Sequence, residues 1–126
     1  MKANSASSRA KRVMVVDDDE DFGEIMRIWL RTNGHEPTIA TSVPDALDQI
    51  APGGFALYIL DNCLGQGSGI DLCERIRASD SHTPIMFYSA VDLKTEIQKG
   101  FDAGAQAYIV KPDFEQLEQA IGRLIH

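Results

Sequence analysis

The sequence predicts an α/β domain built on a doubly wound, five-stranded parallel sheet in strand order 2-1-3-4-5. Three observations lead to this fold class. Short apolar runs alternate along the chain with longer stretches in which apolar residues recur at helical spacing. The run FALYIL (55–60) is apolar on both of its alternating faces, which is typical of a central strand covered by helices. The 126 residues are enough for one domain with its own core.

The first strand and helix are predicted between residues 13 and 34. The strand is the apolar run VMVV (13–16). Apolar residues then recur at helical spacing, at Phe22, Ile25, Met26, Trp29 and Leu30. This spacing predicts an amphipathic helix that ends near Asn33-Gly34, a pair that favours a left-handed C-cap.

The second unit has weaker signals. Residues 35–40 are a strand candidate, and Thr41 or Ser42 is expected to be the N-cap of the helix that follows. Pro44 falls in the first turn of that helix, where proline is well tolerated, and the helix is predicted to end near Ile50. The third strand is the run 55–60 described above.

The third helix is predicted to begin after the glycine-rich loop GQGSG. Ser68 is expected to cap it, with Asp71 three residues later. Its inner face is marked by Ile70, Cys73 and Ile76.

Two further strands are predicted, PIMFY (84–88) and AYIV (107–110). Between them a helix is expected to stop at Gly104, and the apolar stripe predicted to face the core consists of Leu93, Ile97 and Phe101. A last helix runs to the chain end, and its apolar positions are Phe114, Leu117, Ile121 and Leu124.

Composition narrows the function class. The chain is 44% hydrophobic and 25% charged, as in ordinary globular domains. Its formal charge of −7 argues against direct nucleic-acid binding, because that binding depends on Lys and Arg. No apolar span or secretory signal is evident, so we expect a cytoplasmic protein without membrane association. Residues 1–10 are expected to be a flexible tail and residues 11–126 the domain.

The predicted topology brings three acids to one crevice. Asp17 and Asp18 follow the first strand and Asp61 follows the third, at the point where the winding of the sheet reverses. Clustered carboxylates raise one another's pKa and destabilise a fold unless a cation is present. Because all the side-chain ligands are oxygens, the expected ion is Mg²⁺.

Two more polar residues follow other strands. Ser89 comes after the fourth strand and Lys111 after the fifth. A hydroxyl can donate to a phosphoryl oxygen and an ammonium can balance its charge. With a metal beside them, Asp61 could act as a nucleophile and form an aspartyl phosphate.

Four motifs together, VMVVDDDED, YILD, YSA and AYIVKP, resemble the receiver domain of bacterial two-component response regulators, which has a flavodoxin-like fold. The resemblance extends from about residue 12 to the end of the chain. By position it implies that Asp61 is the phosphoacceptor. It also implies that Asp17, Asp18 and the backbone carbonyl of Cys63 help to hold Mg²⁺, directly or through water, and that Lys111 contacts the phosphoryl group.

The resemblance also implies a switch. Ser89 would be the switch hydroxyl that contacts the phosphoryl group, Tyr108 the aromatic residue coupled to it, and Lys111–Pro112 a cis peptide bond. In the family, phosphorylation alters the face made by helix 4, strand 5 and helix 5. The implied partners are a histidine kinase or phosphotransfer protein and an unknown downstream protein or output domain. The only implied catalysis is self-catalysed phosphoryl transfer and autodephosphorylation.

Several positions depart from the family pattern. Gly65 stands where most receivers have proline, so we expect a looser loop. Gln106-Ala107 replaces the aspartate pair of regulators that dimerise on DNA, so that dimer is not assumed. Cys63 and Cys73 lack the spacing of a zinc site, and Cys63 is expected to be a buried or half-buried, inert thiol.

Two other functions remain open. A Mg²⁺-dependent phosphohydrolase of the haloacid-dehalogenase type would use Asp17-x-Asp19 with Asp17 as nucleophile, although Asp21 stands where that family has Thr or Val. A degenerate receiver used only for protein contacts is the third hypothesis, but every phosphorylation residue is present. Asp19, Glu20 and Asp21 are interpreted as acids that favour the start of a helix.

Overall fold

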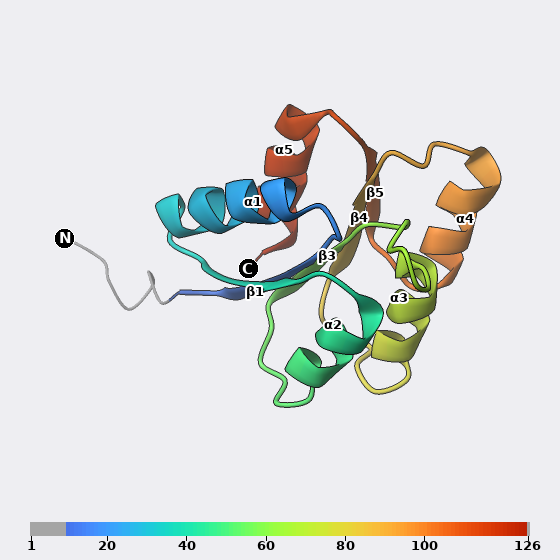
Figure 1. Cartoon of the computed structure of the whole chain (residues 1–126), viewed down its shortest axis with the longest axis horizontal. Coiled ribbons are helices and arrows are strands. Elements are labelled where there is room, and N and C mark those ends of the chain that lie inside the picture. The colour runs from blue at the N-terminus through green and yellow to red at the C-terminus, as the bar shows by residue number, and fades with distance from the viewer. Residues whose placement is uncertain (1–9, 126) are drawn as a thin grey trace.

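The computed structural model describes residues 10–125, and in this range five strands and five helices alternate (Figure 1). The strands are β1 (Arg12–Val16), β2 (Glu36–Ala40), β3 (Leu57–Leu60), β4 (Ile85–Ser89) and β5 (Ala107–Val110). The helices are α1 (Glu20–Thr32), α2 (Val43–Ile50), α3 (Gly69–Arg77), α4 (Lys94–Asp102) and α5 (Phe114–Leu124). The predicted tail lies, except for Ala10, outside the described residues.

All neighbouring strands are parallel and the sheet order is β2-β1-β3-β4-β5, so the predicted fold class and topology are confirmed. The carboxyl ends of all five strands meet at one edge of the sheet. Because the order reverses between β1 and β3, the segments that follow these two strands lead to helices on opposite faces of the sheet.

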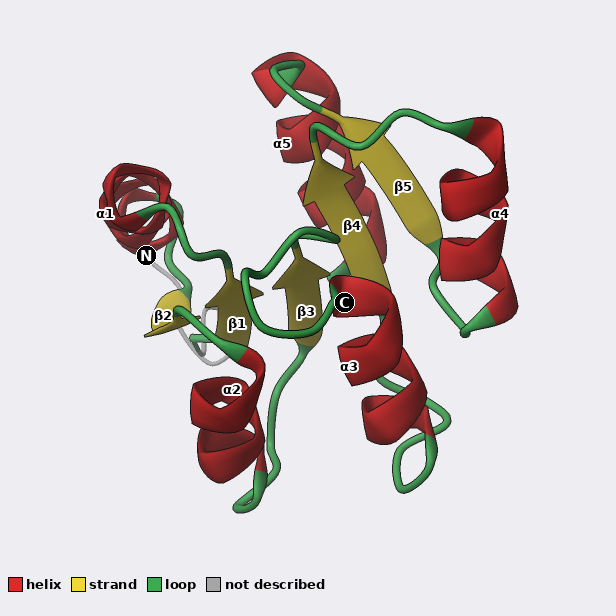
Figure 2. Ribbon diagram, turned by 45° about the vertical axis from the view of Figure 1, so that its right-hand side comes forward, coloured by secondary structure: helices red, strands yellow, loops and turns green. Residues whose placement is uncertain are grey.

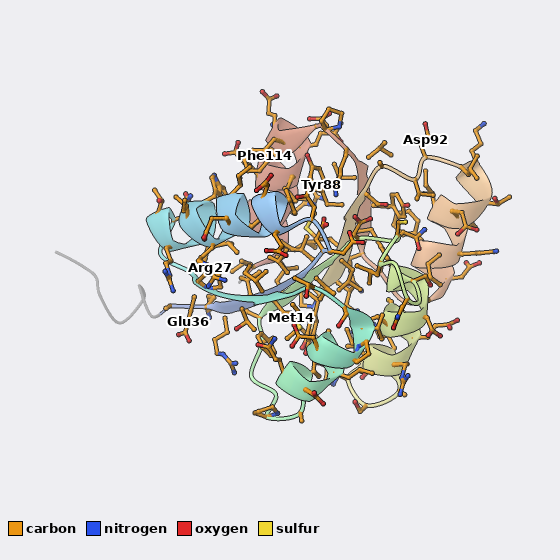
Figure 3. All side chains as sticks on the ribbon, in the orientation of Figure 1. Met14, Arg27, Glu36, Tyr88, Asp92 and Phe114 are labelled. Atoms are coloured by element: carbon orange, nitrogen blue, oxygen red, sulfur yellow. The ribbon has the colours of Figure 1, made fainter. Side chains whose placement is uncertain are left out.

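The sheet is buried on both faces. Helices α1 and α5 cover one face, and α2, α3 and α4 lie on the other (Figure 2). Side chains along each strand alternate between the two cores, as the pleat requires. In Figure 3 Met14 points toward α2, whereas Tyr88 lies on the side of α1 and α5. The strand interiors are therefore apolar throughout, which explains the continuous runs in the sequence.

Side-chain caps begin most of the helices. Asp19 accepts from the backbone N–H groups of Asp21 and Phe22 at the start of α1, which confirms its interpretation as a helix-starting acid. Ser42 is the N-cap of α2 and Ser68 that of α3, as predicted. These caps fix where each crossover helix leaves the loop beyond the sheet edge.

The predicted inner stripe of α4 is wrong. Leu93 and Phe101 are 62% and 42% exposed, and Ile97 is only half-buried. The buried position is Gly100, where a Cβ atom would lie 3.2 Å from the rings of Phe87 and Tyr108. Helix α4 approaches the sheet through this glycine, so its larger apolar side chains point outward.

The apolar stripe of α1 is narrower than predicted. Met26 and Leu30 are fully buried and Phe22 and Trp29 half-buried, but Ile25 is 54% exposed.

Over residues 10–125, no helix combines the length and the apolar character needed to cross a bilayer.

Candidate functional site

Asp17 and Asp61 lie side by side at the carboxyl edge of the sheet. The hydrogen-bond ladder continues one residue past β1 and β3, since the Asp61 N–H donates to Val16 O over 2.9 Å and the Asp17 N–H donates to Ala40 O over 3.0 Å. Both side chains are buried, with 1% of Asp17 and 7% of Asp61 exposed. The sheet itself thus sets the spacing of these two carboxylates.

Lys111 joins the two carboxylates. Its backbone N–H donates to Ser89 O over 2.9 Å, which places it at the same edge, one strand beyond β4. Its ammonium Nζ donates to Asp17 Oδ2 over 2.9 Å and to Asp61 Oδ2 over 3.1 Å. The Lys111–Pro112 peptide bond, expected to be cis, is cis. Three sequence-predicted residues, 94 positions apart at most, therefore form one hydrogen-bonded group.

The electrostatics of this group follow from burial. Burial raises the pKa of Asp17, the charge of Asp61 adds to the rise, and hydrogen bonds from Lys111 and the Asp19 amide only partly oppose it. Burial alone would lower the pKa of Lys111, but its hydrogen bond and attraction to Asp17, together with Asp61, raise it overall. The site thus favours an ammonium at Lys111 and disfavours the charged form of Asp17.

Asp18 completes a metal-ligand arrangement. Carboxylate oxygens of Asp17, Asp18 and Asp61 lie within 4.8 Å of one another, and Asp18 is exposed while the other two are buried. Three converging carboxylate oxygens, with one of the three residues open to solvent, fit a hard cation such as Mg²⁺ that retains several waters. The donor set contains no thiolate or imidazole.

Cys63 lies beside Asp61. Its backbone N–H donates to Asp61 Oδ1 over 3.1 Å, so this residue helps to orient the carboxylate. Its side chain is exposed, and the prediction of a buried or half-buried thiol was wrong. The reason is that Cys63 lies in the loop after β3, outside the apolar part of the strand.

Ser89 and Tyr108 are connected through the backbone of Val91. Ser89 is fully buried, and its Oγ accepts from the Val91 N–H over 3.2 Å. The Tyr108 hydroxyl donates to Val91 O over 2.7 Å, while its ring stacks on Phe87 with the centroids 5.2 Å apart. The two predicted switch residues thus hold the same residue of the β4–α4 loop.

The glycine-rich loop has a conformation that proline could not adopt. Gly65 has φ +66°, and the Gln66 N–H donates to Leu64 O over 2.5 Å, which closes a three-residue turn. Because proline is fixed near φ −65°, a proline at position 65 could not form the turn that Gly65 makes. A Cβ atom at position 65 would lie 3.6 Å from Asp18 Oδ2, so the turn adjoins the carboxylates.

Sequence reasoning missed two aromatic residues at the site. The Lys111 ammonium lies over the ring of Phe22, 5.0 Å from its centroid, and 5.8 Å from the centroid of Tyr88. Helical spacing identified Phe22 only as a core residue of α1, and Tyr88 was only part of an apolar strand. No sequence signal joins them to Lys111, because the contact depends on how α1 packs against β4.

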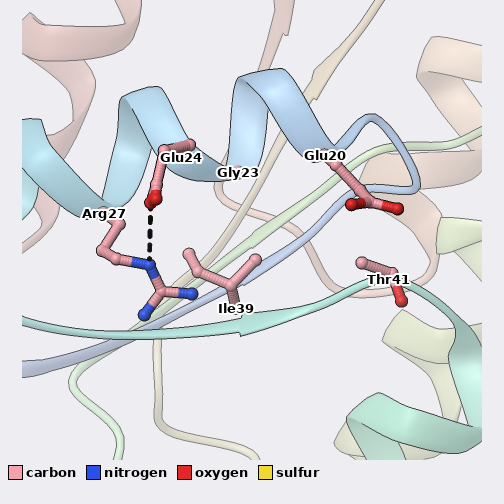
Figure 4. Close-up of a pocket in the computed structure, with 6 residues that line it drawn as sticks. All are labelled: Glu20, Gly23, Glu24, Arg27, Ile39 and Thr41. Carbon is pink, nitrogen blue, oxygen red and sulfur yellow. Dashed lines mark ion pairs between the residues drawn. The ribbon is translucent and has the colours of Figure 1, made fainter.

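A separate hollow of about 400 Å³ lies between α1 and β2. Figure 4 shows the residues that line it, Glu20, Gly23, Glu24, Arg27, Ile39 and Thr41. Arg27 is paired with Glu24 over 3.3 Å within the same helix. None of these residues belongs to the predicted site.

The phosphohydrolase alternative requires Asp17 and Asp19 to act together. The Asp19 carboxylate instead accepts from Asp21 N–H and Phe22 N–H as the cap of α1. Asp17 and Asp61, which follow different strands, are the acids that share Lys111. This arrangement does not support the haloacid-dehalogenase reading.

Comparison with known proteins agrees with the geometry. The sequence model of the response regulator receiver domain matches residues 13–122. An uncharacterized transcriptional regulatory protein of Bacillus subtilis, YkoG, is 33% identical over 112 residues, which are 89% of this chain and 48% of that protein. The response regulator MprA of Mycobacterium avium is 34% identical over 113 residues, 90% of this chain and 49% of the relative. The chain thus spans about half the length of the curated relatives it matches.

Solved structures show the same fold. The non-phosphorylated receiver domain of HemR from Leptospira biflexa has a TM-score of 0.85 and 30% identity, and the match covers 90% of this chain and 93% of that one. The response regulator TrrA from Thermotoga maritima, in complex with Mg²⁺ and beryllium fluoride, has a TM-score of 0.82 and 27% identity, with 91% and 99% covered. From its topology, its carboxylate edge and these matches, the chain belongs to the response regulator receiver domain family.

Proposed function

We propose that this receiver accepts a phosphoryl group on Asp61, with Mg²⁺ held by Asp17, Asp18 and Asp61. The observation that carries the proposal is the convergence of these three carboxylates, with Lys111 bound to two of them at 2.9 and 3.1 Å. Such a group combines a nucleophilic oxygen with positive charge on the side where phosphoryl charge develops. The Mg²⁺-bound state of the relative TrrA supports the choice of metal.

The transfer itself needs little from the protein beyond positioning. A carboxylate oxygen of Asp61 attacks the phosphorus of the donor, a new P–O bond forms, and the bond to the donor breaks as the leaving group departs with its electron pair. When bound, Mg²⁺ supplies positive charge to the phosphoryl oxygens. Lys111 Nζ, which contacts Asp61 Oδ2 in the structure, is placed to donate to a phosphoryl oxygen on that carboxylate.

The output would depend on Ser89 and Tyr108. If the Ser89 hydroxyl turned toward a phosphoryl oxygen on Asp61 and donated to it, the movement of Ser89 Oγ would lengthen or break the hydrogen bond that it accepts from the Val91 N–H. Since Val91 O also holds the Tyr108 hydroxyl, any shift of this residue changes how Tyr108 is held. The surface of α4, β5 and α5, on which Leu93 and Phe101 are exposed, would then differ between the two states.

The partners follow from the same chemistry. A histidine kinase or a phosphotransfer protein would supply the phosphoryl group, and a downstream protein or output domain would bind the altered surface. The relative YkoG is described as a transcriptional regulatory protein and is about twice as long as the matched region. Phosphoryl transfer to Asp61 and autodephosphorylation, in which water takes the phosphoryl group, would both be self-catalysed by the receiver.

The test is incubation with acetyl phosphate and Mg²⁺, followed by intact mass measurement. We expect one added phosphoryl group, lost in alkali and absent without Mg²⁺ or in Asp61→Asn. Asp71→Asn removes an acid from the first turn of α3, outside the carboxylate cluster, and is expected to be labelled like the wild type. Label that persists in Asp61→Asn but disappears in Asp17→Asn would favour the phosphohydrolase, and no label at all would favour a contact-only module.

A further inference from the structure

An aromatic pair borders the ammonium of Lys111. Phe22, in the first turn of α1, and Tyr88, in β4, have stacked rings with centroids 5.4 Å apart and an interplanar angle of 30°. Lys111 Nζ lies over both rings, 5.0 Å from the Phe22 centroid and 5.8 Å from the Tyr88 centroid. Both distances are within the range in which a ring face attracts a cation.

The rings and the carboxylates hold the ammonium from different directions. Two of its three N–H donors are directed to Asp17 Oδ2 and Asp61 Oδ2. The aromatic pair adds attraction to ring faces, which accept no conventional hydrogen bond and so do not compete for those donors. The Lys111 side chain is consequently only 22% exposed, although lysine is usually among the most exposed residues.

We propose that Phe22 and Tyr88 are positioning residues that keep the Lys111 ammonium beside Asp61 and so increase the rate of phosphoryl acceptance. This inference rests on the proposed function of Asp61. The lysine side chain is long and flexible, and holding it in one place costs rotamer freedom. The Phe22 ring from α1 and the Tyr88 ring from β4 restrict the Lys111 side chain already in the folded protein, so this rotamer entropy is lost before the donor arrives. Such preorganisation of a reacting group is the basis of positional catalysis.

The plain alternative is that the two rings only fill the core. Tyr88 is 4% exposed and Phe22 is half-buried, and both pack in the cluster between the sheet, α1 and α5. A packing role predicts that any aromatic-to-leucine change in this cluster has similar consequences. A positioning role predicts that only the rings under Lys111 affect phosphoryl transfer.

A rate measurement separates the two readings. The initial rate of phosphoryl incorporation from acetyl phosphate is measured with saturating Mg²⁺, at a temperature where thermal melts show every variant folded. Phe22→Leu and Tyr88→Leu are each expected to reduce the rate about 2- to 5-fold, and the double variant about 4- to 25-fold. Tyr88→Phe keeps the ring and is expected to restore the rate relative to Tyr88→Leu.

Trp29→Leu is the matched control. Trp29 lies seven residues after Phe22 in α1, packs in the same cluster and contacts the Phe114 ring edge-on, with the centroids 6.1 Å apart. The Trp29→Leu variant loses an aromatic ring from the same helix but keeps both rings that lie under the Lys111 ammonium. The phosphorylation rate of Trp29→Leu is expected to stay within about 1.5-fold of the wild type.

A spectroscopic readout tests the contact without phosphorylation. Protons above an aromatic face are shifted upfield in NMR, so the ε-methylene resonance of Lys111, assigned by its absence in Lys111→Met, should lie upfield of the other lysines. Phe22→Leu should move it downfield, whereas Trp29→Leu should not. An unmoved resonance, or a wild-type rate in the folded double variant, would overturn the inference. If the wild type takes no phosphate on Asp61, the proposed function fails, and the resonance alone decides whether the rings hold Lys111.

Discussion

Replacing Gly69 with alanine should disturb both the fold and the phosphoacceptor. Gly69 is the buried first residue of α3, and its N–H donates to Asn62 O over 3.1 Å. A Cβ atom at this position would overlap the carbonyl oxygen of Asp61 and lie 2.8 Å from a ring carbon of Phe87. The main obstacle is backbone, which cannot rotate away as a long side chain could. Either α3 or the segment that carries Asp61 must therefore move.

The expected loss of stability in Gly69→Ala follows from overpacking. Extra atoms in a closely packed interior cost about 1–3 kcal/mol and sometimes more, and overlap with backbone places Gly69→Ala at about 3 kcal/mol. For a domain of this size, 1 kcal/mol shifts the melting temperature by about 3–5 °C. Gly69→Ala is therefore expected to melt about 10 °C below the wild type. Its rate of phosphorylation should also fall, because the displaced backbone belongs to Asp61.

Replacing Gly122 with alanine is a control that is expected to change stability in the opposite direction. Gly122 lies in α5, it is exposed, and a Cβ atom there would meet nothing within 4 Å. Alanine is favoured over glycine inside a helix by about 1 kcal/mol, so Gly122→Ala should melt a few degrees above the wild type. Thermal melts followed by circular dichroism compare the three proteins. Equal melting temperatures for the two variants, or a Gly69→Ala protein as stable as the wild type, would refute the steric reasoning.

Three further changes have expected outcomes. Because burial raises the pKa of Asp17, the ionised carboxylate destabilises the folded protein at a pH above that folded pKa. Asp17→Asn should therefore raise the melting temperature at pH 7. This increase in melting temperature should vanish below the ordinary pKa of 3.8, where Asp17 of the wild type is protonated in both the folded and the unfolded state. Arg77 donates twice to Gly104 O at the end of α4, so Arg77→Met should lower the free energy of unfolding by about 2 kcal/mol in urea titrations. Tyr108→Phe removes the 2.7 Å hydrogen bond to Val91 O and should cost about 1 kcal/mol in the same assay; no loss would mean that this bond holds nothing in place.

The sheet and its order were predictable because apolar runs and turn residues carry most of that information locally. Asp17, Asp61 and Lys111 could be assigned to one site because parallel strands bring their carboxyl ends to the same edge. The structure adds that Lys111 bridges the two acids directly. Sequence could not give that contact, since it depends on the path of a flexible side chain over a neighbouring strand.

Helix α4 shows where a hydrophobic pattern misleads. Leu93, Ile97 and Phe101 fall on one stripe, and a stripe of large apolar residues usually marks the buried face. The helix instead packs through Gly100 against Phe87 and Tyr108, since the absence of a side chain lets its backbone come close to these rings. A pattern that counts hydrophobicity gives no weight to a glycine, so the buried face was assigned to the wrong side.

The contact of Lys111 with Phe22 and Tyr88 was unpredictable for another reason. Each ring fits its own element as an ordinary apolar residue, and their shared contact arises only when α1 lies against β4. The loop at Gly65 was predictable in part. The sequence shows that glycine replaces the usual proline, but only the structure shows the positive φ of Gly65 and the tight turn around it. Whether this loop is looser than in other receivers stays a prediction.

Chemical trapping shows whether acids that are far apart in the sequence form a divalent-ion site where Asp61 becomes an acyl phosphate. The protein is treated with acetyl phosphate and Mg²⁺, reduced with borohydride, which converts an aspartyl phosphate to homoserine, and analysed by peptide mass spectrometry. We expect homoserine at position 61 alone, and none when Mg²⁺ is removed by a chelator. Homoserine at position 17, or an equal yield at position 61 without the metal, would show that Asp61 is not a metal-dependent phosphoacceptor.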